Sequence, residues 1–321
     1  MSDIINCYHK NFSGGIGDFI KGSVYLYSQA IKYGMSIDID WKYHPIGKHI
    51  YSGCKIKYNP KYIIDIEDLQ FTHKNKNTMG HWLHNILNSV AEDKQFRPAT
   101  ISSWYSKLDS CPDNRINYIN KYQIGNRCKE VIKNKIRFTK KINLLFEEQK
   151  LKNYGITHFR LGDRHTLPKI DENIKTYDSV ISNNYNLKEF NHDYDYYYYL
   201  IKKEKRENNL ENIIVMSDSN DFKRFISEES KNKKGISVLH FNSGHTANQP
   251  GLLKYTNFKK NVTKDQYKYT ALDLKIIINS LKNITYSCYN WGSGFVVWPS
   301  KLYDIPLDIK VLNNIEEAKY V

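Results

Sequence analysis

A histidine and an arginine two positions apart are the residues of this chain best suited to binding an anion. His158 and Arg160 close the apolar run 154–160, and Gly162 and Asp163 follow directly. In an α/β fold, a strand that ends this way delivers its last side chains to the crevice at the carboxyl edge of the sheet, where ligands bind. The planar fork of donors on an arginine matches a phosphate. The sequence therefore predicts an anionic ligand here.

The same two residues also allow a purely structural interpretation. His158 could cap a strand edge, and Arg160 could pair with Asp163 at the turn. Structural ion pairs shift the pKa values of their residues just as functional sites do. The residue types alone therefore leave both interpretations open.

A second apolar run, 212–216, also ends in polar residues. Ser217 could cap a helix expected over 221–226, and Asp218 could face a ligand at the same crevice. Taken alone, an ordinary helix N-cap is the simpler explanation of this stretch.

A third apolar run, 283–288, leads into the polar, glycine-containing turn 290–294, and an apolar segment resumes over 295–298. A serine and glycine turn at a helix start presents hydroxyls and backbone N–H groups to a phosphate. Apolar residues at helical spacing precede the run: Ala271, Leu274, Ile277, Ile278 and Leu281.

Near the N-terminus, a strand over 4–8 is followed by a glycine-rich loop, Asp18 and a helical pattern to about residue 33, with Gly34 as the expected C-terminal stop. Strand, loop and helix start together can receive an anion on backbone amides. A tight turn without a ligand explains the pattern equally well. The glycines of this loop are Gly14, Gly15 and Gly17.

Length and composition bound the fold and the partners. The 321 residues suit two α/β domains of ordinary size, or one large one, and 40% apolar content indicates a globular chain. The net charge of +14 favours anionic partners. Because the lysines are dispersed and the cluster 202–206 fits a solvated helix end, nucleic-acid binding is a minority hypothesis.

The five cysteines have no metal-ligand spacing and are odd in number, which favours a reduced compartment. No apolar run of 18 residues and no secretory signal are found, so we expect no membrane span and a cytoplasmic location. No Asp-x-Asp pair is placed to hold a metal.

The order His158, Arg160, Gly162, Asp163 resembles the first signature of the fucosyltransferase superfamily, although Leu161 stands where many members have a second arginine. The resemblance implies a metal-independent GDP-fucose enzyme with no cofactor. It implies the α/β GT-B fold, in which two Rossmann-like domains face a central cleft. It also implies that Arg160 binds the diphosphate of the donor. Most eukaryotic Golgi members have a membrane anchor, so the lack of an apolar run favours a bacterial or viral type of enzyme.

Two later stretches extend the resemblance. Ser217 and Asp218 are similar to the second signature, in which Ser219 replaces an aspartate. The third signature implies that Asp273 binds guanine. By the same resemblance, the residues near the diphosphate, together with His158, are Ser287, Asn290 and Ser293.

For the catalytic base, the glycine loop resembles that of the bacterial heptosyltransferases, which have Gly-Asp where this chain has Gly17 and Asp18. Asp18 is therefore the first candidate for a general base that deprotonates an acceptor hydroxyl. Asp171 and Glu172, in the loop after the first signature, remain open alternatives.

The sequence as a whole predicts an acceptor-side domain over 1–150 and a nucleotide-sugar domain over 151–321. The expected activity is an inverting transfer of fucose from GDP-fucose to a glycan or protein acceptor, with Arg160 and Asp18 as catalytic residues. The alternatives are a heptosyl-like GT-B transferase, or a basic nucleic-acid-binding protein on a degenerate transferase fold.

Overall fold

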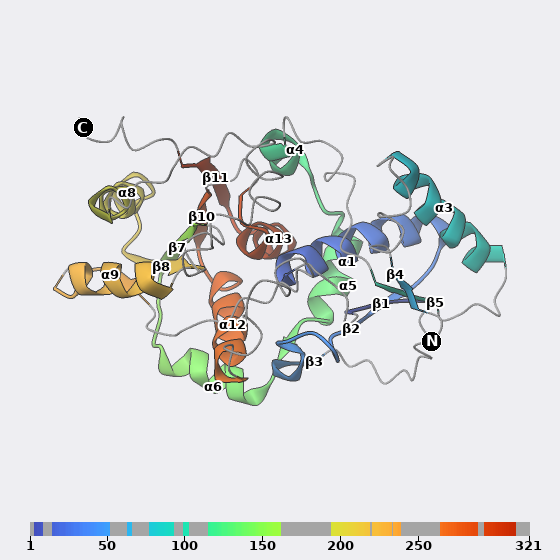
Figure 1. Cartoon of the computed structure of the whole chain (residues 1–321), viewed down its shortest axis with the longest axis horizontal. Helices are drawn as coiled ribbons and strands as arrows, with labels where there is room; N and C mark the ends of the chain where they lie inside the picture. Colours follow the sequence, from blue (N-terminus) through green and yellow to red (C-terminus); the bar gives the residue numbers. More distant parts are fainter. Residues whose placement is uncertain are drawn as a thin grey trace, which may run out of the picture.

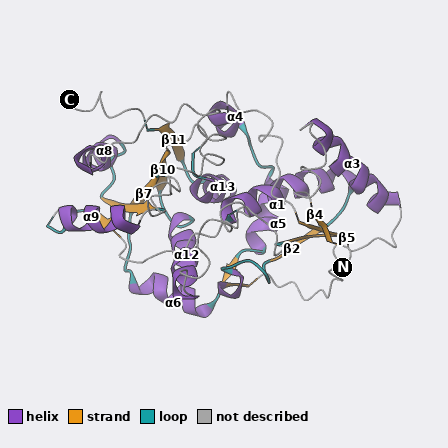
Figure 2. Ribbon diagram, in the orientation of Figure 1, coloured by secondary structure: helices purple, strands orange, loops and turns teal. Residues whose placement is uncertain are grey.

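The structure, a computed structural model, describes eleven stretches of the chain that carry nearly all of the predicted elements. They are residues 3–8, 15–51, 63–65, 77–92, 99–102, 115–161, 194–218, 220–232, 234–238, 264–287 and 292–312. The main strands form two separate parallel sheets, and helices lie between them (Figures 1 and 2).

The first sheet has four parallel strands in the order β2-β1-β5-β4. Each strand contains isoleucine, a β-branched residue that favours extended backbone. The strands are β1 (Ile4–Cys7), β2 (Ile37–Asp40), β4 (Ile63–Asp65) and β5 (Ala99–Ser102). The predicted first strand and the glycine-led helix that follows it are confirmed.

The second sheet has five parallel strands in the order β11-β10-β7-β8-β9. The strands are β7 (Tyr154–Arg160), β8 (Asn212–Ser217), β9 (Ile236–Val238), β10 (Lys282–Ser287) and β11 (Leu307–Val311). Because β7 lies at the centre of this sheet, the interpretation of His158 as a cap on a strand edge is wrong.

Helices cover both faces of the second sheet. On one face, α8 (Tyr194–Glu207) and α9 (Asn220–Ser230) pack against a cluster that includes Phe159 and Val215. On the other, α12 (Lys264–Ile277) and α13 (Gly294–Tyr303) pack against Ile156 and Met216. Strands buried on both faces are typical of a doubly wound unit. The predicted α/β class with Rossmann-like units is confirmed.

The remaining helices are associated with the first half of the chain. They are α1 (Ile16–Ala30), α3 (Asn77–Glu92), α4 (Arg115–Lys121), α5 (Asn126–Asn134) and α6 (Lys140–Glu148), with short 3-10 turns at Ile31–Tyr33 and Gly47–His49. A two-stranded antiparallel ribbon pairs β3 (Ile50–Tyr51) with β6 (Arg137–Phe138). Gly34 ends the first helical stretch in the left-handed conformation, φ 66°, as its position predicts.

Helices α1 and α13 join the two units. A Cβ at Gly17 would lie 2.1 Å from the carbonyl carbon of Gly294, so the two helices touch backbone to backbone at this pair of glycines. Val297 and Trp298 of α13 belong to the same apolar cluster as Phe19 of α1. The sheets fall on either side of residue 150, and the exact domain boundary stays a prediction.

One detail of the predicted core is wrong. The helical apolar stripe that begins at Ala271 is predicted to reach Leu281. In the structure α12 ends at Ile277, and Leu281 is 57% exposed. By Leu281 the chain has left the helix and turns toward β10, which begins at Lys282, so the helical spacing no longer applies.

Candidate functional site

Arg160 and Asp218 form an ion pair at the carboxyl edge of the second sheet. Arg160 is the last residue of β7, and Asp218 directly follows β8, the neighbouring strand. The distance from Arg160 Nη1 to Asp218 Oδ2 is 2.5 Å, and the backbone N–H of Leu161 donates to Asp218 Oδ1 at 2.9 Å. Arg160 therefore pairs with Asp218; Asp163, its alternative partner, lies outside the described residues.

His158 lies in the same strand, on the face that α12 and α13 cover. It is 4% exposed, and its ring centroid is 6.3 Å from that of Phe295 in the first turn of α13. Burial lowers its pKa to about 4, with Arg160 and Lys223 acting in the same direction and Asp218 opposing them. His158 is therefore neutral at pH 7. No described residue hydrogen-bonds its Nδ1.

Asp273 and Lys223 add an opposite pair of charges to the site. Asp273, on α12, is 8% exposed, and Lys223, on the first turn of α9, is 6% exposed. Burial lowers the pKa of Lys223, and the nearby carboxylates of Asp273 and Asp218 oppose this shift. We call Arg160, Asp218, Lys223 and Asp273 the charged cluster.

Lys223 is a residue that the sequence analysis missed. The sequence does contain a signal for this residue. Ile226, Ser227 and Ser230 follow Lys223 at spacings of 3, 4 and 7 positions, and all four side chains are buried. Such spacing places residues on one helix face. A lysine in a first turn is ordinarily solvated, so the stripe alone did not identify it.

The predicted serines take different positions. Ser217 Oγ donates to the carbonyl oxygen of Phe159 at 2.9 Å, and α9 begins only at Asn220, so the expected N-cap at Ser217 is wrong. Ser287 is fully buried at the end of β10, in register with Arg160. Ser293 is the N-cap of α13 and is 4% exposed. Asn290 lies outside the described residues.

The glycine loop meets this region through the contact between the two helices. Gly17 touches Gly294, which follows Ser293 directly, so the N-terminal turns of α1 and α13 are neighbours. Asp18 follows Gly17; its side chain is 42% exposed and lies 3.2 Å from Lys21 Nζ. Its carboxylate also accepts a bond from the Gly15 N–H at 3.3 Å, which caps its own helix.

Gly15 and Gly17 therefore have local roles in the structure, as the N-cap of α1 and as the point of close packing. Gly14 lies outside the described residues. A role of these glycines toward a ligand stays a prediction.

The corresponding edge of the first sheet is aromatic. His44 lies among Tyr8, Trp41 and Phe19, with ring centroids at 4.4, 5.3 and 5.9 Å. Its Nδ1 accepts the backbone N–H of Ile46 at 3.2 Å, and burial lowers its pKa to about 3. We call these four rings the aromatic box. The histidine in it is neutral at pH 7.

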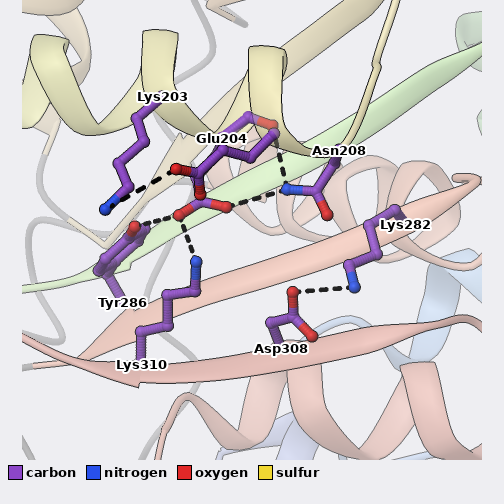
Figure 3. A network of polar contacts seen from close by, with 8 residues as sticks. Lys203, Glu204, Asn208, Lys282, Tyr286, Asp308 and Lys310 are labelled. Atoms are coloured by element: carbon purple, nitrogen blue, oxygen red, sulfur yellow. Dashed lines mark hydrogen bonds and ion pairs between the residues drawn. The ribbon is translucent and has the colours of Figure 1, made fainter.

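A buried network supports the strand ends from the side of α8 (Figure 3). The carboxylate of Glu204 is fully buried and accepts bonds from Tyr286 Oη, Asn208 Nδ2 and Lys310 Nζ, the last at 2.5 Å. Tyr286 immediately precedes Ser287, and its ring stacks on Phe159 at 5.3 Å. The network therefore anchors the residues next to Ser287 and Arg160.

Two other features of the described residues lie apart from the charged cluster. A cavity of about 790 Å³ runs along β11 beside the connection between α4 and α5, and none of the predicted site residues lines it. Within the described part of the chain, no group of three or more His, Cys, Asp or Glu could hold a metal ion, and no helix is long and apolar enough to cross a membrane.

Comparisons with known proteins yield similarity of structure only. No protein-family model and no curated protein sequence matches the chain. Among solved structures, it is similar to apo POFUT1, with 9% identity and a TM-score of 0.42, covering 96% of this chain and 98% of that one.

Two further structures are similar at the same level. NodZ α-1,6-fucosyltransferase with GDP has 9% identity and a TM-score of 0.45, with 93% of this chain and 91% of that one covered. A variant of Arabidopsis thaliana FUT1 with GDP has 9% identity and a TM-score of 0.47, with 99% and 73% covered. With identities of 9% and TM-scores below 0.5, these similarities assign neither a family nor a function, and a functional assignment has to rest on the residues of this chain.

Proposed function

We propose that this protein is a glycosyltransferase that transfers fucose from GDP-fucose, with inversion, to a glycan or protein acceptor, without a metal ion. The observation that carries the proposal is the convergence of His158, Arg160 and Asp218 at the carboxyl edge of the second sheet. Ligands bind at this edge in open α/β sheets.

The proposed chemistry needs a positive site for the leaving diphosphate. Arg160, only 20% exposed, would neutralise the charge that grows on the diphosphate as the bond to the sugar breaks. The N-terminus of α13, with Ser293 as its N-cap, would add backbone N–H donors to the same anion. In this proposal Asp273 accepts hydrogen bonds from guanine.

The acceptor would approach from the side of α1. Asp18 is the proposed general base, and two features support it: its side chain is 42% exposed, and the adjacent Gly17 touches Gly294 beside the N-terminus of α13. A base must lie within hydrogen-bond reach of the acceptor hydroxyl when the donor is bound. The acceptor-side role of residues 1–150 belongs to the same proposal.

A heptosyl-like transferase is the second candidate, because Asp18 directly follows Gly17 in the first turn of α1. In that case the donor would carry ADP, and Asp18 would keep its role toward the acceptor.

A thermal-shift panel with GDP-fucose, GDP-mannose, ADP-sugars and UDP-sugars tests the proposal, because a ligand of the native state raises its stability by mass action. We expect a shift with GDP and GDP-fucose that is lost in Arg160→Ala and kept in Arg137→Ala, a matched change at an exposed position of β6. A shift with ADP-sugars alone favours the second candidate. No shift with any nucleotide contradicts both and directs attention to nucleic-acid binding.

A further inference from the structure

The anion-binding arginine already has an anionic partner inside the protein. Asp218 uses one carboxylate oxygen for Arg160, at 2.5 Å, and the other for the N–H of Leu161, at 2.9 Å. A phosphate that approaches Arg160 therefore meets a carboxylate bound to the same guanidinium. It either binds the other N–H donors of Arg160 beside Asp218 or displaces Asp218 from the guanidinium.

Displacing Asp218 without a second cation would be costly. Its side chain is only 9% exposed, and a buried carboxylate that loses its partner keeps its desolvation penalty without compensation. Whether a diphosphate can take Arg160 thus depends on what else lies near Asp218.

Among the described residues, Lys223 is a second cation near Asp218, besides Arg160. It is on α9, which begins two positions after Asp218, and both residues are buried against the same edge of the sheet. Asp218 and Asp273 both act on the ammonium group of Lys223. In the part of the chain that the structure describes, the charged cluster thus sets two cations, Arg160 and Lys223, against two carboxylates, Asp218 and Asp273.

We propose that Asp218 holds the place of a diphosphate on Arg160 in the unliganded protein, and that Lys223 receives Asp218 when a diphosphate takes Arg160. Asp218 and Lys223 are then positioning residues that set the affinity for the diphosphate. The identification of the anion as a diphosphate rests on the proposed function. The exchange itself requires only the cluster.

A double-mutant cycle tests the exchange, with inorganic pyrophosphate and GDP as separate calorimetric probes. We expect Asp218→Asn to strengthen pyrophosphate binding and Lys223→Met to weaken it about tenfold. In the Asp218→Asn background, Lys223→Met should change the affinity less than about twofold, because no carboxylate then needs a new partner. Lys231→Met, the same change at an exposed position just beyond α9, should have no effect.

An equal loss from Lys223→Met in both backgrounds would overturn the exchange, since Lys223 would then act on the ligand or on folding. Lys223→Arg keeps the charge and should retain binding, which separates the exchange from a general loss of structure.

The two probes separate this inference from the proposed function. If GDP binds no better than pyrophosphate while the cycle shows the expected coupling, the nucleotide assignment fails and the exchange stands. If GDP binds well but Asp218→Asn leaves both affinities unchanged, the exchange fails and the nucleotide assignment stands. Absence of binding of either probe to any variant contradicts both.

Discussion

The two sheets share a parallel topology but carry opposite chemistry at their carboxyl edges. In the second sheet, the strand ends present the charged cluster, Arg160, Asp218, Lys223 and Asp273. In the first, the residues after β1 and β2 contribute to the aromatic box around the neutral His44. A Rossmann-like unit therefore fixes where a ligand binds and leaves the kind of ligand to the residues that follow each strand.

The two edges also differ in exposure. The four rings of the aromatic box are 0–3% exposed and pack as core, whereas Arg160 at the charged edge is 20% exposed. An anionic nucleotide therefore suits the charged edge, and Asp18, 42% exposed, is the acceptor-side group of the proposed reaction. The predictions below separate the two edges, beginning with the largest effect.

The first prediction concerns two buried histidines, His44 in the first unit and His158 in the second; burial also lowers the pKa of His49. Both native pKa values, about 3 and about 4, lie below the ordinary value of 6.5. The unfolded chain therefore binds more protons below pH 6.5, and stability is lost as the pH falls. Between pH 7 and 5 each histidine should cost about 2 kcal/mol. Urea unfolding at pH 7, 6 and 5 measures the sum.

His44→Gln and His158→Gln should each remove about 2 kcal/mol of this pH dependence, which assigns a share to one unit at a time. If one variant abolishes the whole dependence and the other none, the two histidines are not equivalent in burial and the comparison fails on this point.

The second prediction concerns the joint between the units. Gly17→Ala places a methyl group 2.1 Å from the backbone of Gly294, so α1 and α13 must separate. We expect a loss of about 3 kcal/mol in the free energy of unfolding, despite the better helix propensity of alanine. Gly125→Ala, where a Cβ meets nothing within 4 Å, should cost less than about 1 kcal/mol. Similar losses for both variants would show that the glycine contact does not hold the units together.

The third prediction concerns the network behind the charged edge (Figure 3). Glu204→Gln keeps the shape of the side chain but removes the charge that Lys310 and Tyr286 contact. We expect the free energy of unfolding to fall by about 2 kcal/mol, because hydrogen bonds to a buried charged group are stronger than those to a neutral group. Denaturant midpoints of the two proteins measure it, and an unchanged midpoint contradicts the role of the network.

The smallest effect should come from a neighbouring ion pair in the same sheet. Lys282 and Asp308 are 2.8 Å apart, but their side chains are 21% and 39% exposed. Lys282→Ala should therefore cost no more than about 1 kcal/mol. A loss as large as that of Glu204→Gln would mean that burial does not distinguish the two pairs.

Much of the fold could be predicted from the sequence, because its signals are local. The apolar runs that became β7, β8 and β10 end in polar residues within one or two positions of where the strands end. Gly34 ends the first helical stretch as predicted, because only a left-handed residue suits that position.

The candidate site was less predictable, because its contacts join distant segments. The sequence predicts that Asp218 faces a ligand. In the structure Asp218 bonds to Arg160, a contact that depends on the pairing of β7 with β8. The packing role of Gly17 depends on Gly294, near the other end of the chain. The aromatic box could not be predicted because His44 meets Phe19 and Tyr8, which lie far away in sequence, only in the folded chain.

The measurement that most directly tests the asymmetry is calorimetric titration of GDP into the wild type and one variant of each edge. Arg160→Ala removes the cation of the charged edge, and Trp41→Phe changes the aromatic box while keeping a ring. We predict that Arg160→Ala weakens GDP binding at least about tenfold. Trp41→Phe should leave it within about twofold. Unchanged binding in Arg160→Ala, or a larger loss in Trp41→Phe, would contradict the assignment of the anion to the second sheet.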